Sequence, residues 1–300
     1  MKFSLWQGPH QPWEEVLRAA GHAERTGWDG LWAADHLMPL QGDAPTLECW
    51  TGLAGLATAV PRVRIGSLVS GNTYRHPAVL AKMAATIDRT SGGRLVLGLG
   101  AGWQRNEHEA YGIDFYDTKE RLARLDEACQ MLKALFVNDR TDFSGRYYTL
   151  RDAPLDPKPL QQPLPLLIGG GGERVTLKIA ARYCDEWNTW GTPDVLAAKG
   201  AVLDRHCERI GRDPATIRRS AQALVFLSED PGSLDQIRQR MTGGARPVVI
   251  GTPAEVQQAM ADYAAAGVDE FILPDFNLTT PEAKTETMDL FIERVAPALR

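Results

Sequence analysis

The chain has 300 residues, of which 44% are hydrophobic and 24% are charged. That balance is typical of a soluble globular protein, and it excludes a disordered chain, a collagen and a small disulfide-bonded domain. There are 33 basic and 38 acidic residues, which gives a net charge of −5, and no run of lysine or arginine. We therefore expect no nucleic acid and no membrane as partner, and a small molecule as the ligand.

The cysteines give no sign of a disulfide or zinc framework. The four cysteines, Cys49, Cys129, Cys184 and Cys207, lie far apart, without a Cys-x-x-Cys pair. No histidine stands at a zinc-ligand spacing from them, so we predict reduced, structural thiols and no metal site. The N-terminal residues 1–6 run directly into a polar segment, too soon for a signal peptide, and the expected location is the cytoplasm.

Short apolar segments alternate with longer segments of helical period along the whole chain. Such alternation predicts parallel strands joined by crossover helices, and eight strands close a TIM (β/α)8 barrel. No shift in composition marks a linker, so residues 1–300 are predicted to form a single α/β domain. The predicted strands are Lys2–Gln7, Gly30–Asp35, Val63–Val69, Arg94–Gly100, Leu164–Gly169, Glu186–Trp190, Ser220–Leu227 and Asp269–Pro274.

Two stretches break this rhythm and are predicted to be insertions near the barrel mouth. Residues 142–159 contain three prolines and the run Phe143–Tyr148, which suggests a small hairpin. Residues 230–247 have little periodicity and contain Gly243-Gly244, so we expect that stretch to be mobile. A helix is predicted to begin at Thr252-Pro253, where a hydroxyl, a proline and Glu255 form a capping sequence.

Polar residues just after a strand are site candidates, because a TIM barrel holds its active site at the carboxyl ends of its strands. The second strand ends in Asp35-His36, where the imidazole could donate a proton or orient a ring. A capping or loop role for His36 is equally consistent with its position. The third strand ends in Ser70-Gly71-Asn72, which suits either a bulge against a flat ligand or an ordinary turn.

Glycines follow the fourth and fifth strands. Gly100-Ala101-Gly102 presents bare backbone, and the Glu107-His108-Glu109 run beyond it is expected to be mostly solvated charge, not a metal face. After the fifth strand, the four glycines Gly169–Gly172 precede Glu173, Arg174 and a helix. Consecutive N–H groups at a helix start favour binding of a phosphate or another anion, with Arg174 as a second partner. A flexible connection is the alternative.

Tryptophans near strand ends are candidates for the walls of an aromatic pocket. These are Trp6, Trp103, Trp187 and Trp190, although core packing is the default for any one of them. No lysine ends a predicted strand, which disfavours Schiff-base aldolase chemistry.

Several blocks of the sequence together resemble the bacterial luciferase-like monooxygenase superfamily, and more narrowly its branch that uses coenzyme F420, a deazaflavin. The resemblance covers nearly the full chain except residues 230–247. The blocks that carry it are Phe3–Trp6, Ala34–His36, Arg75–Pro77 with Lys82–Thr86, Ser91–Trp103, Ile168–Glu173 and Glu270–Phe276.

The resemblance implies a barrel with a flavin or deazaflavin at its mouth, and commonly a homodimer. In it, Ser70-Gly71 would form a bulge with a non-prolyl cis peptide, and the Gly169–Gly172 loop would take the cofactor phosphate. The sugar-phosphate dehydrogenases of this superfamily have a catalytic glutamate where this chain has Trp103, which argues against sugar-phosphate oxidation. The cofactor-binding residues implied in this way are Asp35, His36, Ser70, Gly71, Asn72, Gly100, Ala101, Gly102, Gly169, Gly170, Gly171, Gly172, Glu173 and Arg174.

The sequence thus predicts an F420-dependent oxidoreductase in which a hydride moves between the deazaflavin and a small organic substrate. His36 is the predicted catalytic residue that handles the accompanying proton, and Glu107 is a second choice. The alternatives are an FMN-dependent monooxygenase on the same fold, a barrel that binds a deazaflavin or phosphate ligand without turnover, and a phosphosugar isomerase or aldolase.

Overall fold

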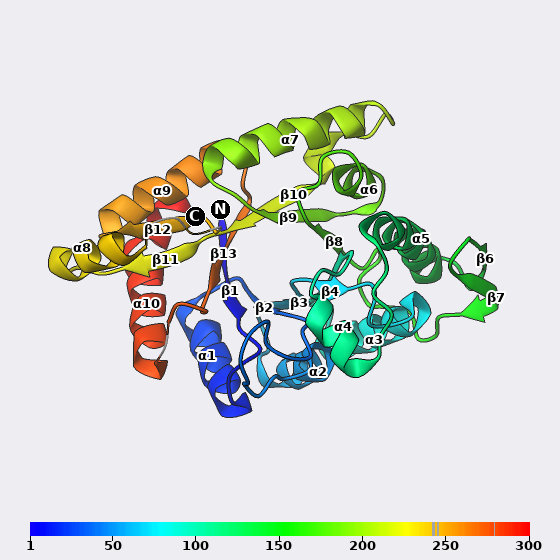
Figure 1. The fold of residues 1–300 in the computed structure, drawn as a ribbon, viewed down its shortest axis with the longest axis horizontal. Coiled ribbons are helices and arrows are strands. Elements are labelled where there is room, and N and C mark those ends of the chain that lie inside the picture. The colour runs from blue at the N-terminus through cyan, green and yellow to red at the C-terminus, as the bar shows by residue number, and fades with distance from the viewer. Residues whose placement is uncertain (242–243, 245, 279) are drawn as a thin grey trace.

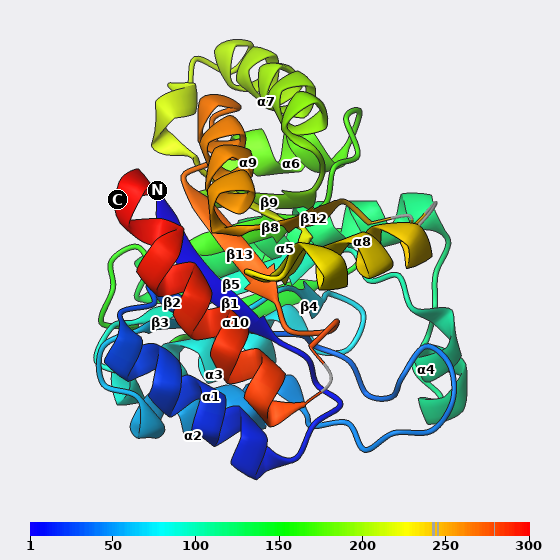
Figure 2. The same cartoon turned by 90° about the vertical axis from the view of Figure 1, so that its left-hand side faces the viewer.

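The computed structural model describes residues 1–241, 244, 246–278 and 280–300. Eight parallel strand positions close into a barrel, and the helices surround it (Figures 1 and 2). Closure comes from the first barrel strand, which pairs with both the second and the last, and from the pairing of the third with the fourth. The predicted TIM barrel is confirmed. The barrel strands are β1 (Lys2–Gln7), β2 (Gly30–Ala33), β3 (Arg64–Ser67), β4 (Ser70–Gly71), β5 (Leu95–Gly100), β8 (Leu166–Gly169), β9 (Glu186–Trp190), β10 (Arg218–Gln222) and β13 (Glu270–Pro274).

The helices bury one face against the outside of the barrel. In α1 the residues Val16, Ala19, Ala20 and Ala23 are buried, which is the spacing of a single helical face. The helix ends at Gly27, whose φ of +89° closes the last turn without a side-chain penalty. The helices are α1 (Trp13–Thr26), α2 (Cys49–Ala59), α3 (Pro77–Thr90), α4 (Arg105–Tyr111), α5 (Thr118–Val137), α6 (Thr176–Tyr183), α7 (Pro193–Glu208), α8 (Pro231–Arg240), α9 (Pro253–Ala265) and α10 (Pro281–Arg294).

The interior of the barrel is layered along its axis. Arg64, Glu186 and Glu270, each the first residue of its strand, form ion pairs at the amino-terminal end. An apolar cluster fills the middle, and the indole N–H of its Trp32 donates to Glu270 Oε1 at 3.1 Å. The other buried members of this cluster are Leu68, Val96, Leu167 and Ile272. Because this layer is packed, a ligand can enter only from the carboxyl end of the strands.

The third barrel position is interrupted by a bulge between β3 and β4. Gly66 pairs with Val96 and Ser70 pairs with Leu99, so β3 and β4 advance four residues while β5 advances three. The extra residue is what defines a bulge, and it changes the direction of the backbone that follows. The sequence-based expectation of a bulge at the end of the third strand therefore holds.

The expected place of the cis peptide within this bulge was wrong. The non-prolyl cis bond joins Leu68 and Val69, and does not join Ser70 and Gly71. The neighbouring strand also comes close at this point, because a Cβ on Gly98 would lie 1.9 Å from the carbonyl oxygen of Ser67. The glycine that this bulge requires thus belongs to the neighbouring strand β5.

The first predicted insertion is a hairpin, but it lies away from the barrel mouth. Strands β6 (Arg140–Ser144) and β7 (Thr149–Pro154) pair antiparallel and project beside α5 (Figure 1). Residues 140–159 contribute nothing to the main cavity described below. The turn is held by Glu127 of α5, whose carboxylate accepts N–H bonds from residues 146–148, so the hairpin is anchored to a helix flank.

Part of the second predicted insertion is helical. Residues 231–240 form α8, capped by the Asp230 carboxylate, which accepts from the N–H groups of Gly232 and Ser233. The predicted strand Ser220–Leu227 is split, because Ala223 separates β10 from β11 (Leu224–Leu227), which leaves the barrel and pairs in parallel with β12 (Val248–Gly251). Residues 242, 243 and 245 of this predicted insertion lie outside the described residues.

Candidate active site

A cavity of about 1110 Å³ opens at the carboxyl ends of the barrel strands. Every barrel position contributes to its wall, which is the arrangement expected of a TIM-barrel active site. Its lining includes Trp6, Asp35, His36, Ser70, Gly71, Tyr74, Gly100, Ala101, Gly102, Trp103, Gly169, Gly170, Thr176, Asn188, Trp190, Gln222, Arg246, Asp275 and Phe276.

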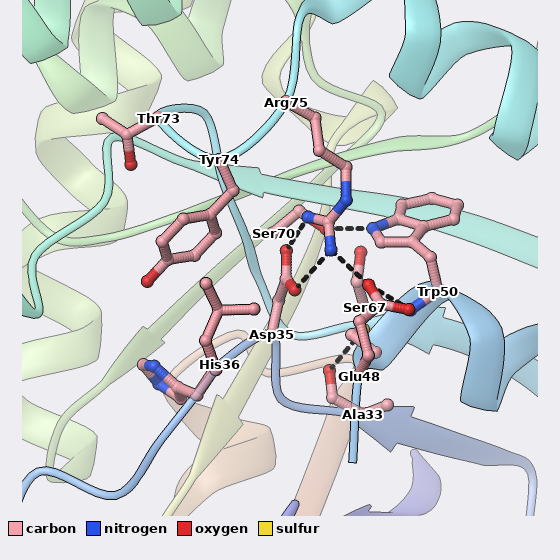
Figure 3. Close-up of polar contacts among 12 residues, drawn as sticks. Ala33, Asp35, His36, Glu48, Trp50, Ser67, Ser70, Thr73, Tyr74 and Arg75 are labelled. Carbon is pink, nitrogen blue, oxygen red and sulfur yellow. Dashed lines mark hydrogen bonds and ion pairs between the residues drawn. The ribbon is translucent and has the colours of Figure 1, made fainter. Parts of the chain in front are cut away.

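A buried charge network supports the floor beneath β2 (Figure 3). The Arg75 guanidinium donates to both oxygens of Asp35, at 2.6 and 3.1 Å, and also contacts Glu48. Glu48 is in turn the N-cap of α2 and accepts from the N–H groups of Trp50 and Thr51. Burial raises the pKa of Asp35 and Arg75 opposes this shift, while the two carboxylates raise the pKa of Arg75 against its own burial.

This network fixes the position of the predicted cofactor residue Asp35. The family resemblance implied that Asp35 binds the cofactor; the structure places it on the cavity lining with its carboxylate in a bidentate pair with Arg75. Ser70 is held nearby, because the indole N–H of Trp50 donates to its Oγ at 2.8 Å. Arg75 was present in the strand-end sequence as the fifth residue after Ser70, but nothing in a single sequence pointed it at Asp35.

His36 lies on the cavity wall with a buried carboxylate behind it. Its Nδ1 is 3.0 Å from Glu107 Oε1, and the N–H of Leu37 donates to Glu107 Oε2 at 2.8 Å. The Tyr74 hydroxyl donates to the same carboxylate. The Trp103 ring meets the His36 imidazole edge to face, with 5.5 Å between ring centroids.

The charge on Glu107 determines which nitrogen of His36 carries the proton. Although burial favours the neutral acid, hydrogen bonds from His36, Tyr74 and the N–H of Leu37 hold the pKa of Glu107 below its ordinary value. A carboxylate only accepts hydrogen bonds, so it assigns the proton to Nδ1 of His36. Nε2 is then the nitrogen that can take up or release a proton in the cavity.

The prediction that most of the Glu107-His108-Glu109 run is solvated was wrong. Glu107 and His108 are fully buried, and only Glu109 is exposed. The His108 ring is bonded on both sides, Nδ1 to the carbonyl of Gln104 and Nε2 to Thr73 Oγ1, each at 2.7 Å. The short helix α4 packs its inner face against Tyr74. The sequence of residues 107–109 alone does not indicate this packing.

The bulge and the β5 glycines together present backbone to the cavity. Ser70 and Gly71 line it from one side, and Gly100–Gly102 line it from the neighbouring strand. Asn72 does not line the cavity, since its Nδ2 donates to the Tyr148 hydroxyl at 3.2 Å. Its buried Oδ1 has no partner among the described residues.

The glycine loop after β8 only partly faces the cavity. Gly169, Gly170 and Thr176 line it, whereas Gly171, Gly172 and Glu173 do not. Gly170 has a φ of +123°, a conformation that favours glycine, and this turns the chain away from the barrel axis. The predicted anion loop thus offers its first two residues and the first hydroxyl of α6.

Arg174 does not join this site. It lines a separate cavity on the outer surface together with residues of α6 and α7. The reason is the turn that follows Gly170, which carries the chain outward before α6 begins. The expectation that Arg174 assists at the main anion site was therefore wrong.

Three of the four predicted pocket tryptophans line the cavity. Trp6, Trp103 and Trp190 do so, while Trp187 is buried in the core between barrel and helices, where its indole N–H donates to the Gly170 carbonyl. Side chains alternate along a strand, so residues 187 and 190 of β9 point to opposite faces. The alternation of side chains along a strand would therefore have been enough to predict, from the sequence, that only one of the two faces the cavity.

The far wall of the cavity comes from residues that the sequence did not single out. Arg246 lies over the rings of Trp190 and Phe276, at 5.1 and 5.6 Å from the ring centroids. Lys284 of α10 pairs with Asp275 at 3.0 Å, immediately after β13. The only sequence feature that could have predicted this wall is the position of Asp275 and Phe276 just after a strand.

Comparison with known proteins agrees with this geometry. The family model described as luciferase-like monooxygenase matches residues 1–242. The chain belongs to the luciferase-like monooxygenase family. The predicted family resemblance is thus confirmed.

Among curated relatives, an F420-dependent glucose-6-phosphate dehydrogenase of Beutenbergia cavernae is 37% identical over 93% of this chain and 91% of that protein. Another, from Kineococcus radiotolerans, is 34% identical over 71% of this chain and 64% of that protein. A solved structure of an F420-dependent secondary alcohol dehydrogenase with an F420-acetone adduct superposes with a TM-score of 0.85 at 22% identity, covering 100% and 99% of the two chains. The match therefore spans less than two thirds of the length of some curated relatives, and 91% of the protein from Beutenbergia cavernae.

The residues present fit a flat, anionic cofactor of the kind used in this family. Bare backbone on two adjacent strands leaves room for a ring, and Gly170 with Thr176 offers polar groups at a helix start. The volume of about 1110 Å³ is at the upper end of ordinary ligand sites, which leaves space for a second small molecule.

Two further expectations concern metals and membranes. Within the described residues, no group of three or more histidine, cysteine, aspartate or glutamate side chains is arranged to hold a metal ion. None of the helices described has the length and apolar character needed to cross a bilayer.

Proposed function

We propose that this protein is an oxidoreductase that transfers a hydride between coenzyme F420 and a small organic substrate. The observation that carries the proposal is His36, a cavity histidine whose Nδ1 is held by the buried Glu107 carboxylate, facing a wall of bare backbone. Curated relatives that are named F420-dependent dehydrogenases support the choice of cofactor.

The deazaflavin, when bound, supplies the carbon that accepts or releases the hydride. Ser70, Gly71 and Gly100–Gly102 would lie against its ring, and Gly169, Gly170 and Thr176 would hold its phosphate. The cavity walls orient the substrate and exclude water, which is the main contribution a protein makes to hydride transfer.

His36 would move the proton that accompanies the hydride. When an alcohol is oxidised, its hydroxyl proton passes to Nε2 of neutral His36, and the resulting imidazolium is stabilised by Glu107 at 3.0 Å. In the reverse direction the imidazolium returns that proton to the carbonyl oxygen. A positioned base of this kind contributes about 10²- to 10⁴-fold to a rate.

We propose that the substrate is not a sugar phosphate. Trp103 stands where the sugar-phosphate enzymes of the superfamily are expected to have a glutamate, and here it packs against His36. Trp6, Trp190 and Phe276 form an aromatic wall across the cavity, which favours a substrate with an apolar part.

Separate titrations with coenzyme F420 and with FMN test the cofactor. We expect the fluorescence of F420 to be quenched saturably as it binds the protein. The fluorescence of FMN should change clearly less. A Thr176→Val variant should weaken F420 binding several-fold, because it removes a hydroxyl from the cavity, whereas Thr149→Val on the distant hairpin should not. Tight binding of FMN alone would overturn the proposal in favour of a monooxygenase, which solved structures of the same fold include.

Turnover is tested with a panel of small alcohols, by following the loss of the oxidised coenzyme's visible absorbance. Reduction of F420 by an apolar alcohol and not by glucose 6-phosphate is the expected result. Tight F420 binding without hydride exchange across the panel would instead favour a binding barrel without enzymatic activity.

We also propose a cytoplasmic homodimer, on the basis of the family resemblance. Cys49, Cys129, Cys184 and Cys207 are all buried and unpaired, which supports a reducing compartment. Light scattering at micromolar concentration would give the mass of the particle, and a monomeric mass would contradict the dimer.

A further inference from the structure

A second cavity, of about 370 Å³, lies on the outer surface of the molecule and is lined almost entirely by basic side chains. It is formed by α6 and the end of α7, which pack side by side (Figures 1 and 2). Its lining residues are Arg174, Lys178, Arg182, His206, Arg209 and Ile210. Nothing in the proposed reaction uses these residues, and none of them is among those that line the main cavity.

The sequence brings these charges together by helical spacing. Lys178 and Arg182 are four residues apart, which places both on one side of α6, and Arg174 lies in the turn two residues before that helix begins. His206 is in the last turn of α7, and Arg209 follows that helix directly. The negative end of the α7 dipole favours cations there, which explains how this side of the cavity tolerates its charge.

Carboxylates neutralise little of this charge. Arg182 pairs with Asp126 at 3.4 Å, and within the described residues no ion pair is formed by Arg174, Lys178, His206 or Arg209. The nearby Glu173 carboxylate is directed to Lys199 at 3.3 Å, and only its backbone carbonyl accepts from His206 Nε2.

We infer that this cavity binds a small, multiply charged anion, one that carries at least two phosphate or carboxylate groups. Four cationic side chains and a histidine around one hollow repel one another, and an anion relieves that repulsion in a chain whose net charge is −5. The arginines supply forked donors that match phosphate and carboxylate oxygens. The volume exceeds what a single phosphate fills, so two linked anionic groups fit the arrangement of basic residues on two helices.

The site stands next to the proposed cofactor loop but is separate from it. Gly169 and Gly170 line the main cavity, and four residues after Gly170 the chain supplies Arg174 to the outer one. An anion at the outer site would therefore restrain the segment that leads into α6. The inference stands on the outer residues alone and does not need the proposed function.

Isothermal titration of the full chain with inorganic pyrophosphate at low ionic strength tests this site. We expect saturable binding that weakens steeply with added salt, and a loss of at least about tenfold in affinity in the double variant Arg174→Gln, Arg209→Gln. The matched control is Arg146→Gln, Arg151→Gln, which removes two exposed arginines of the hairpin and changes the net charge equally. Circular dichroism melting checks that both double variants fold like the unaltered chain.

Three results would overturn the inference. They are no detectable binding by the unaltered chain, an equal loss of affinity in the hairpin control, and loss of the pyrophosphate signal once the protein is saturated with coenzyme F420. The last result would assign the anion to the main cavity. If the protein does not bind F420 at all, the proposed function fails, while the comparison between the two double variants still decides this site.

Discussion

Both ends of the barrel contain an arginine between two carboxylates. At the amino-terminal end, Arg64 contacts Glu186 and Glu270 beneath the packed interior layer. At the carboxyl end, Arg75 contacts Asp35 and Glu48 beside the open cavity. The same charge pattern thus closes one end of the barrel and supports a candidate binding site at the other. The difference is that the packed apolar layer covers the arginine at the amino-terminal end, whereas the cavity lies beside the arginine at the carboxyl end.

The comparison teaches that buried charge alone does not mark an active site. Glu186 is buried, and burial raises its pKa despite Arg64 and Arg218, yet it does not line the main cavity. Removing a charge from the closed end should therefore cost stability, whereas removing one from the open end should alter activity or ligand binding. The following variants test that division, from the largest expected effect to the smallest.

His36→Ala should reduce kcat by about 10²- to 10⁴-fold, because the variant lacks the group that moves the proton. The affinity for coenzyme F420 should change little, since the proposed ring contacts come from backbone on other strands. Steady-state kinetics with an alcohol from the panel and a cofactor titration give the two values. Unchanged turnover would remove His36 from the mechanism.

Arg64→Met should destabilise the protein by about 3–5 kcal/mol, since it leaves Glu186 and Glu270 buried without their shared partner. The control is Arg218→Met, which removes a more exposed partner of Glu186 and should cost about 1 kcal/mol or less. Urea unfolding measures both. The activity per folded molecule should not change in either variant, and a large loss of activity with intact stability would contradict the division between the two ends.

Glu107→Gln should lower kcat by about tenfold, because an amide holds the Nδ1 proton of His36 less firmly than a carboxylate does. Its effect on stability should depend on pH. The pKa of Glu107 is lowered by folding, so its contribution is present above its ordinary value of 4.5 and is lost as the pH falls through the folded-state pKa.

Urea unfolding of both proteins at several pH values checks this sign. The difference in unfolding free energy between the unaltered chain and Glu107→Gln should be largest near neutral pH and should shrink below about pH 4.5. A difference that is constant with pH would show that Glu107 gains nothing from its three donors.

Trp190→Phe and Trp187→Phe should affect different properties, KM and stability respectively, although the two residues are only three positions apart. The first removes part of the cavity wall and should raise KM a few-fold with little loss of stability. The second removes a buried indole and its bond to the Gly170 carbonyl, and should cost about 1–2 kcal/mol of stability. Equal effects of both on KM would contradict the placement of Trp187 in the core.

Most of the barrel could be predicted from the sequence, because parallel strands buried on both faces leave short apolar runs between helices. The bounds of β1 and β9 were predicted to the residue. The β10–β11 segment was misjudged because an apolar run continues through Ala223 after the strand has left the barrel. A hydrophobic pattern records burial, and β11 remains partly buried against β13 and α10.

The candidate site could be predicted only where it consists of strand ends. His36, Asp35 and Trp103 meet at the cavity because the barrel brings successive strand ends together. Partners from distant segments could not be foreseen, such as Glu107 behind His36 and Arg75 beside Asp35, because ion pairing across the fold leaves no periodic trace in one sequence.

The single extra residue between β3 and β4 has a consequence for how this chain tolerates change. Deleting Val69 would restore an even ladder against β5, and the residues of β4 would move to the opposite face of the strand. Ser70 would lose its place beside Trp50, and Arg75 would no longer reach Asp35. A one-residue deletion here would thus disturb more of the site than several substitutions within it, so the length of this segment constrains the chain more tightly than its composition.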